Sequence, residues 1–437
     1  MGLISDRANQ ALRLDELEGR FDPWLLATTL ALACLGVVMV ASSSIAITEG
    51  MHVGPFYFLN RHLLFLGGGI VLAIGLMRTE LKEVEKHSHL LLALCFLVLL
   101  LVWVPGIGRT VNGARRWLNF GVANFQAVEA VKLMFIVWLS SYLVRNRDAI
   151  GDSWPVLLKP LGVAGALVAM LLVQPDFGSA SLILAVTVGM VWLGGARIRN
   201  LAIPAAVAVA AMAFIVVLEP YRVRRLTSFR DPWADPFNDG FQLTQALIAI
   251  GRGEWTGVGL GASVQKLFYL PEAHTDFIFS VTAEELGFVG VCAIIGLFAV
   301  FTWRAMSVGL RCLRARRPFS GYCAFGVGLW ISLQAFVSMG VNLGILPTKG
   351  LTLPLISSGG SSVLMTCAAM GLLLRVSYEL DRAERKAARL RSDAALPEAR
   401  AEAEEGIGST HSDQASIASS SGRGLRPRIE PKLGAVA

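Results

Sequence analysis

The sequence predicts an all-α polytopic membrane protein with ten transmembrane helices and both termini in the cytoplasm. Of its 437 residues, 54% are hydrophobic and only 16% are charged. The apolar residues come in long unbroken runs, and about 20 such residues in a helix cross a bilayer. This composition excludes a soluble multidomain chain. Because the basic residues cluster between the apolar runs, the net charge of +7 indicates membrane orientation rather than nucleic-acid binding.

Ten apolar runs follow a short mixed-charge segment, 1–22, which we expect to be cytoplasmic and which lacks the pattern of a cleaved signal peptide. Together they form a membrane domain over 23–380, with a large polar loop at 219–275 after the seventh run. The runs 62–77, 127–144 and 160–174 are short or interrupted. The ten runs are 24–44, 62–77, 90–105, 127–144, 160–174, 177–195, 201–218, 285–303, 319–346 and 360–378.

The Lys and Arg residues of the short loops set the orientation. With the N-terminus inside, the inner segments hold 16 of them and the outer short loops hold 5. Because positive loops stay in the cytoplasm, the long 219–275 loop is expected on the extracytoplasmic side. The tail, 381–437, begins with a charged, Ala-rich helical stretch and ends in Ser-, Gly- and Pro-rich sequence, so we expect it to be cytoplasmic and largely disordered.

Four carboxylates lie together in 270–287, at or just inside the predicted membrane boundary: Glu272, Asp276, Glu284 and Glu285. In a helix, Asp276, Glu284 and three small residues would share one face. Such a face is costly in lipid, so we expect it to line a protein-enclosed, wet cavity. The alternative role for Asp276 is a helix N-cap.

The other polar clusters also fall on the predicted outer side. Glu129 and Lys132, three residues apart, share a helix face as an ion pair or as part of a site. Asp176 follows a helix-breaking proline, which favours a structural role. Further polar residues suit phosphates or a broken-helix cavity: Arg115, Arg116, Arg222, Arg225, Arg252, Lys266, Lys349 and Ser361.

The glycines of 251–261 resemble a nucleotide loop only superficially, since no strand precedes them and no Gly-Lys-Ser/Thr follows. Six scattered cysteines without CxxC or Cys/His spacing predict neither a zinc site nor a disulfide framework. The polar clusters indicate an outward-facing cavity for an anionic, lipid-linked substrate. From the residues alone, chemistry on that substrate and its transport remain equally open.

Two motifs resemble the SEDS family of shape, elongation, division and sporulation proteins. They are Pro-Glu-Ala-His-Thr-Asp-Phe-Ile-Phe at 271–279, with Glu-Glu-Leu-Gly at 284–287, and Gly-Gly-Ser-Ser at 359–362. The 346–357 segment is similar to the cell-division branch rather than the elongation branch. The chain departs from the family pattern at Ala127, where a proline is usual, and at Ser358, where a tyrosine is usual.

The resemblance implies ten spans and a peptidoglycan glycosyltransferase of the bacterial inner membrane that polymerises lipid II at the division septum. Its partners would be a class B penicillin-binding protein (an FtsI-type transpeptidase) and the divisome proteins FtsQ, FtsL, FtsB and FtsN. Asp276 matches the essential aspartate, which we expect to act as general base, and Glu129 and Lys132 match a second motif. Lys132 would orient Asp276 or contact phosphate, and loop arginines would stabilise the departing undecaprenyl diphosphate.

Two alternatives share the same cavity: a lipid II flippase and a non-catalytic divisome scaffold. No cofactor is assigned, although a divalent cation (Mg²⁺ or Mn²⁺) is kept as a candidate. The partner's helix is expected to dock on 285–303 and 319–346, at small-residue patches such as Gly287, Gly290, Gly326 and Gly328.

Overall fold

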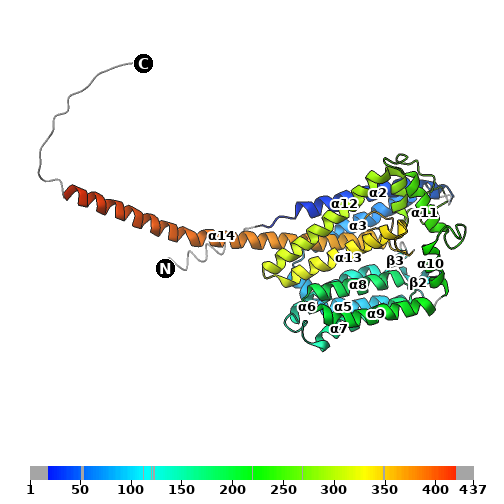
Figure 1. Cartoon of the computed structure of the whole chain (residues 1–437), viewed down its shortest axis with the longest axis horizontal. Coiled ribbons are helices and arrows are strands. Elements are labelled where there is room, and N and C mark those ends of the chain that lie inside the picture. Colours follow the sequence, from blue (N-terminus) through cyan, green and yellow to red (C-terminus); the bar gives the residue numbers. More distant parts are fainter. Residues whose placement is uncertain are drawn as a thin grey trace, which may run out of the picture. The chain divides into compact units, whose positions relative to one another are not determined.

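The computed structural model describes residues 18–50, 54–111, 113–119, 121, 124–218, 220–267, 269–347 and 350–419. Its described residues fall into two compact units, one of which is 19–381 and the other of which includes 382–419. Within 19–381 the long helices run side by side, and β2 (Ala114–Asn119), α10 (Pro220–Arg230) and α11 (Phe241–Arg252) gather at one end of them (Figure 1). The helices are α2 (Pro23–Gly50), α3 (Tyr57–Arg78), α4 (Leu81–Lys86), α5 (Ser88–Leu101), α6 (Ala127–Arg145), α7 (Trp154–Val173), α8 (Phe177–Leu193), α9 (Ile198–Leu218), α10 (Pro220–Arg230), α11 (Phe241–Arg252), α12 (Ile278–Arg314), α13 (Pro318–Asn342) and α14 (Gly360–Ser419).

Each predicted apolar run overlaps one helix of the structure. In the described residues, eight helices are long and apolar enough to cross a membrane, namely α2, α3, α6, α7, α9, α12, α13 and α14. The remaining two runs correspond to α5 and α8, apolar helices of 14 and 17 residues. The mostly helical membrane architecture is confirmed, while the count of ten spans stays a prediction.

The helices differ in how deeply they are buried. Within its apolar window, 83% of α6 is buried, against only 6% of α9. α6 packs against α5 and α13, so the helix that carries Glu129 and Lys132 lies at the centre of the bundle. A charged pair is tolerated at that depth because protein, rather than lipid, surrounds it.

The expectation of a purely helical chain is wrong in one place. Residues 108–126 contain a three-stranded antiparallel sheet in the order β1 (Gly108–Val111), β2 (Ala114–Asn119), β3 (Asn124–Gln126). Arg109 faces Trp117 across β1 and β2, and Trp117 faces Gln126 across β2 and β3. Branched and aromatic side chains favour strands in this loop, which hydropathy alone treats as a connection. The sheet leads directly into α6.

α12 is interrupted at Gly287, whose backbone (φ 65°, ψ −165°) is not helical. Residues 278–286 form a short helix before this break, upstream of most of the predicted 285–303 run. Only glycine adopts such a conformation without strain. The break therefore separates the carboxylate-bearing helix from the membrane-spanning part of α12.

The structure differs from two further expectations. α14 continues through the Ala-, Arg- and Glu-rich residues beyond Asp381 to Ser419, where the sequence predicts a largely disordered tail; these residues have high helix propensity. Residues 420–437 lie outside the described residues. Three of the four glycines expected to dock a partner pack inward instead, since Gly287, Gly326 and Gly328 are buried, while Gly290 is half-buried. A Cβ at Gly326 would meet Ile136 at 2.4 Å.

Candidate functional site

Asp276 lies in a turn immediately before α12. The amides of Thr275 and Phe277 both donate to the Glu272 carbonyl, at 3.1 and 3.2 Å. Asn342, at the end of α13, donates from Nδ2 to the Asp276 carbonyl at 2.9 Å. The backbone of Asp276 is therefore held on two sides.

Asn342 also ties the turn to α12. Its Oδ1 accepts from the amide and the hydroxyl of Ser280, at 3.1 and 2.8 Å. Asn342 is fully buried, so these bonds lie away from water. One amide side chain thus joins the end of α13, the Asp276 turn and the first turn of α12.

The Asp276 carboxyl group is half-buried, and no hydrogen bond reaches it from the part of the chain that the structure describes. Burial raises the pKa of this group to about 7, and Glu272 adds to the rise, while Arg116 and Arg225 act in the opposite direction. A pKa near 7 suits a general base at neutral pH. The helix-cap alternative is wrong, because the N-cap of α12 is Phe277 and has no side-chain cap.

The two arginines that act on Asp276 come from different elements. Arg116 lies on β2, half-buried, and its Nε is buried without a partner among the described residues. Arg225 lies on α10 and is also half-buried. Arg115 precedes Arg116 on β2, opposite Thr110. Cations from the sheet and from α10 therefore both lower the pKa of one carboxylate.

The segment 350–359 and α3 form another wall of the site. A Cβ added at Gly350 would lie 3.0 Å from Oδ2 of Asp276, so the backbone passes close to the carboxylate. The Ser358 amide donates to the His274 carbonyl at 3.0 Å. The His274 ring lies 4.6 Å from the Phe58 ring of α3. Burial lowers the pKa of His274, and Arg61 of α3 acts in the same direction.

Lys132 belongs to a neighbouring buried network. Its Nζ donates to Glu129 Oε1 at 2.9 Å and to Gln334 Oε1 at 2.8 Å, and lies 4.9 Å from the Trp330 ring centroid. Gln334 Nε2 in turn donates to the Thr352 carbonyl at 2.9 Å. In the described residues no hydrogen bond or ion pair joins Lys132 to Asp276. The segment 350–352 links the two indirectly, because Thr352 is bonded to Gln334, the partner of Lys132, and Gly350 lies beside Asp276.

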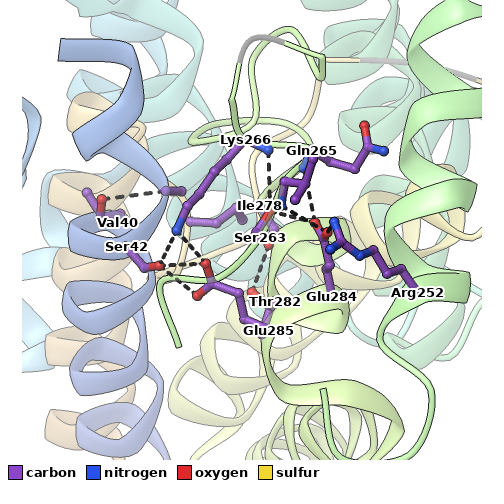
Figure 2. Close-up of polar contacts among 12 residues, drawn as sticks. Val40, Ser42, Arg252, Ser263, Gln265, Lys266, Ile278, Thr282, Glu284 and Glu285 are labelled. Carbon is purple, nitrogen blue, oxygen red and sulfur yellow. Dashed lines mark hydrogen bonds and ion pairs between the residues drawn. The ribbon is translucent and has the colours of Figure 1, made fainter. Parts of the chain in front are cut away.

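Two predicted substrate cations are engaged elsewhere. Arg252 pairs with Glu284 at 3.2 Å, and Lys266 pairs with Glu285 at 2.7 Å (Figure 2). Ser361 is buried at the start of α14. Lys349 and the side chain of Arg222 lie outside the described residues. The shared wet face expected for Asp276 and Glu284 is not found, because Asp276 precedes the helix and Glu284 is covered by the 252–265 segment.

Asp176 has the expected structural role. It caps α8, and its Oδ1 accepts from the Ser179 amide at 3.1 Å. Its Oδ2 accepts from Gln126 Nε2 at 3.3 Å, which ties β3 to the start of α8.

Sequence reasoning missed Gln334, Asn342 and Gly350. Gln334 and Asn342 are polar residues inside the apolar run 319–346, and that signal could have identified them, because buried polar groups in a membrane span require partners. Gly350 carries no comparable signal.

An apolar groove of about 680 Å³ opens between α8, α9 and α13. Its walls carry bulky apolar side chains from the three helices, among them Leu184, Val188, Val209, Met212, Leu329 and Leu333. It can accommodate hydrocarbon. In the described residues, no group of three or more His, Cys, Asp or Glu side chains is placed to hold a metal ion.

Residues 23–382 match the FtsW/RodA/SpoVE cell cycle protein family. A probable peptidoglycan glycosyltransferase FtsW of Xanthomonas oryzae pv. oryzae is 63% identical over 89% of this chain and 79% of its own. A protein of the same description from Halorhodospira halophila is 52% identical over 82% of this chain and 90% of its own.

Solved structures similar to this chain support the same family. A chain described in work on how a peptidoglycan synthase complex coordinates polymerization and crosslinking superposes with a TM-score of 0.67 at 31% identity, covering 82% of this chain and 98% of its own. The rod shape determining protein RodA of Thermus thermophilus gives 0.60 at 30% identity, with 82% and 96% covered. This chain, with its helical bundle and its Asp276 site, therefore belongs to the FtsW/RodA/SpoVE family of cell cycle proteins.

Proposed function

We propose that this chain is a peptidoglycan glycosyltransferase that polymerises lipid II into glycan strands for the septal wall during bacterial cell division. The observation that carries the proposal is the carboxylate of Asp276, which accepts no hydrogen bond from the described residues and whose pKa is raised to about 7, with Arg116 and Arg225 acting on it electrostatically. The family and its FtsW relatives, which are named as probable peptidoglycan glycosyltransferases, support the same assignment.

In the proposed reaction, Asp276 accepts the proton of the acceptor sugar hydroxyl. The hydroxyl oxygen forms a bond to the anomeric carbon of the donor, with inversion, as the bond from that carbon to undecaprenyl diphosphate breaks. A diphosphate leaving group needs cations more than an acid, and we assign that role to Arg116 and Arg225. One carboxylate therefore suffices, unlike the pair that most glycosidases use.

Lys132 is assigned to the support of this site. It neutralises one oxygen of Glu129 and holds Gln334, which binds the Thr352 carbonyl two residues from Gly350. The position of the 350–352 segment beside Asp276 depends on that network. The groove between α8, α9 and α13 offers an apolar surface suited to the lipid of the substrate.

Purified protein in detergent, given lipid II without ATP, tests this function. The proposal expects glycan strands from the wild-type chain and none from Asp276→Asn. Transbilayer movement of lipid II without polymerisation would favour the flippase. Normal division in cells that carry Asp276→Asn would favour the scaffold.

The proposed topology has ten spans, cytoplasmic termini and an extracytoplasmic 219–275 loop, in the inner membrane at the division septum. It rests on the excess of Lys and Arg in the inner segments. Reporter fusions after Arg314 should report the cytoplasm, and fusions within 231–240 the opposite side. An extracytoplasmic Arg314 would overturn this topology.

We propose a class B penicillin-binding protein as partner, docking one transmembrane helix on α12 and α13, with FtsQ, FtsL, FtsB and FtsN in the wider assembly. α12 exposes large apolar side chains at Val289, Ile295 and Trp303. Val289→Cys and Trp303→Cys should cross-link to the partner, whereas Phe301→Cys, at a fully buried position, should not. Cross-links confined to other helices would move the interface.

A further inference from the structure

The break at Gly287 is filled by another part of the chain. Beyond the end of α11, the Val258 amide donates to the Glu284 carbonyl at 2.9 Å and the Gly259 amide to the Glu285 carbonyl at 3.2 Å. In return the amides of Phe288 and Val289 donate to carbonyls of Glu254 and Trp255, at 2.9 and 3.2 Å. Backbone groups that the break frees are satisfied by this segment, as burial requires.

The close approach explains two of the five glycines in 251–261. A Cβ at Gly253 would lie 1.9 Å from the Ala283 carbonyl oxygen, and one at Gly257 would lie 2.1 Å from the Glu285 carbonyl oxygen. No side chain fits at either distance. These glycines are therefore required for packing against α12.

Two buried carboxylates, Glu284 and Glu285, also bind the segment 252–266 through their side chains. Oε1 of Glu284 accepts from Arg252 Nη1 at 3.2 Å and from the Val264 amide at 3.0 Å. Oε2 accepts from Ser263 Oγ at 2.5 Å and from the Gln265 amide at 3.4 Å. Both oxygens of this fully buried group are thus satisfied by one stretch of chain.

Glu285 brings in a third element. Its Oε1 accepts from Lys266 Nζ at 2.7 Å, and both its oxygens lie within 2.7 Å of Ser42 Oγ on α2. Lys266 Nζ also donates to Ser42 Oγ at 3.1 Å. Figure 2 shows Lys266 and Ser42 converging on Glu285, and Arg252 on Glu284. Lys266 is only 7% exposed, so its ammonium is committed to this contact.

We propose that Ser42, Lys266 and Glu285 form a positioning clamp for Asp276. The segment 267–277, which carries Asp276, lies between Lys266 and the short helix 278–286 that carries Glu285. The clamp therefore closes this segment at both ends and fixes both to α2. With one end released, only Asn342 and the local turn would hold Asp276, so the carboxylate would be placed less precisely. A 1 Å misplacement of a catalytic group can cost about 10²-fold in rate.

The inference rests on the proposed function, and one lipid II assay separates the two. If wild-type protein makes no glycan, the function fails; if it does and the clamp variants match it, the inference fails. Lys266→Met and Glu285→Gln should each lower kcat by about 10- to 100-fold with little change in KM. They should also move the midpoint of the pH–rate rise below about 7, because a freed Asp276 regains water.

Three further variants guard against simple misfolding. Lys266→Arg keeps the charge and should restore most of kcat, whereas Ser42→Ala removes one hydroxyl and should lower kcat only a few-fold, about the cost of one hydrogen bond. Lys266→Met/Glu285→Leu leaves no unpaired buried charge, so it should fold and still show the low kcat and the shifted pH midpoint. A raised KM for Lys266→Met with unchanged kcat would instead make Lys266 a substrate cation and overturn the clamp.

Discussion

Asp276 and Glu284 are acids eight residues apart, yet their carboxylates differ in burial and in hydrogen bonding. Glu284 is fully buried, and each of its oxygens accepts hydrogen bonds from the 252–265 segment. Asp276 is only half-buried, and its carboxylate accepts none from the described residues, while its backbone is held by Asn342. A carboxylate whose two oxygens both accept hydrogen bonds from the protein, as in Glu284, stabilises the fold. One whose backbone is fixed and whose oxygens are free can meet a substrate.

Glu129 lies between these extremes. One oxygen accepts from Lys132 at 2.9 Å, and the other is buried without a partner among the described residues. An unsatisfied buried oxygen is costly, and it persists where structure or function requires it. The Glu129–Lys132 pair is therefore an intermediate case: its charges are balanced, but one oxygen of Glu129 accepts no hydrogen bond from the described residues.

The largest expected effect is the loss of catalysis in Asp276→Asn. Removing a general base lowers the rate by about 10²–10⁴-fold, and Asn preserves the shape of the side chain. Glycan synthesis from lipid II measures it, with the thermal unfolding midpoint as a check on folding. The matched control is Asp152→Asn, which removes a carboxylate from an exposed ion pair with Arg197 and should leave the rate unchanged. Near-normal glycan synthesis by folded Asp276→Asn would contradict the assignment of Asp276 as general base and its contrast with the structural Glu284.

Lys132→Met should mainly cost stability. It leaves the buried Glu129 charge uncompensated, and breaking one partner of a buried pair costs about 3–5 kcal/mol. The double variant Glu129→Gln/Lys132→Met should recover much of this loss, since no charge remains, yet stay slow in glycan synthesis because Gln334 loses its ammonium donor. Thermal unfolding in detergent compares the three proteins. A double variant no more stable than Lys132→Met would contradict the pairing argument.

Asp276 should also give the reaction and the fold opposite pH dependences. As a base it works deprotonated, so the rate should rise as pH passes through about 7. Its pKa is raised in the folded chain from an ordinary 3.8, so between these values the unfolded chain binds fewer protons. Its contribution to stability is therefore present at low pH and lost as pH rises towards 7. Asp276→Asn should remove this loss; a parallel pH profile of unfolding in both proteins would contradict the raised pKa.

The smallest effect is expected from Gly350→Ala. The new Cβ would sit 3.0 Å from Oδ2 of Asp276, so the carboxylate must move by a few tenths of an ångström. We expect a few-fold lower kcat at unchanged folding, which the lipid II assay can resolve. Gly165→Ala is the control: a Cβ there meets nothing within 4 Å, and Ala in a helix interior stabilises by about 1 kcal/mol. An unchanged kcat for Gly350→Ala would show that the site tolerates displacement of Asp276.

Much of the bundle could be predicted because membrane helices satisfy their backbone groups locally, so ten apolar runs correspond to ten helices. The pairing of Glu129 with Lys132 follows equally from their three-residue spacing on one helix. Asp276 was identified by its motif, and a structural role for Asp176 by its place after Pro175. The sheet at 108–126 was missed because short strands leave a weak hydropathy signal.

The sequence by itself determined which segments are helical, which charges share a helix face, and which carboxylate matches the family's aspartate. Only the tertiary structure decided what each charge does. From the sequence, Lys266 and Arg252 are predicted to bind substrate, but in the structure they pair with Glu285 and Glu284. Ser42 donates a hydrogen bond to Glu285, 243 residues away in the sequence. The physical reason is that local spacing fixes contacts within a helix, whereas the partner of a buried charge depends on which distant segment fills the break at Gly287.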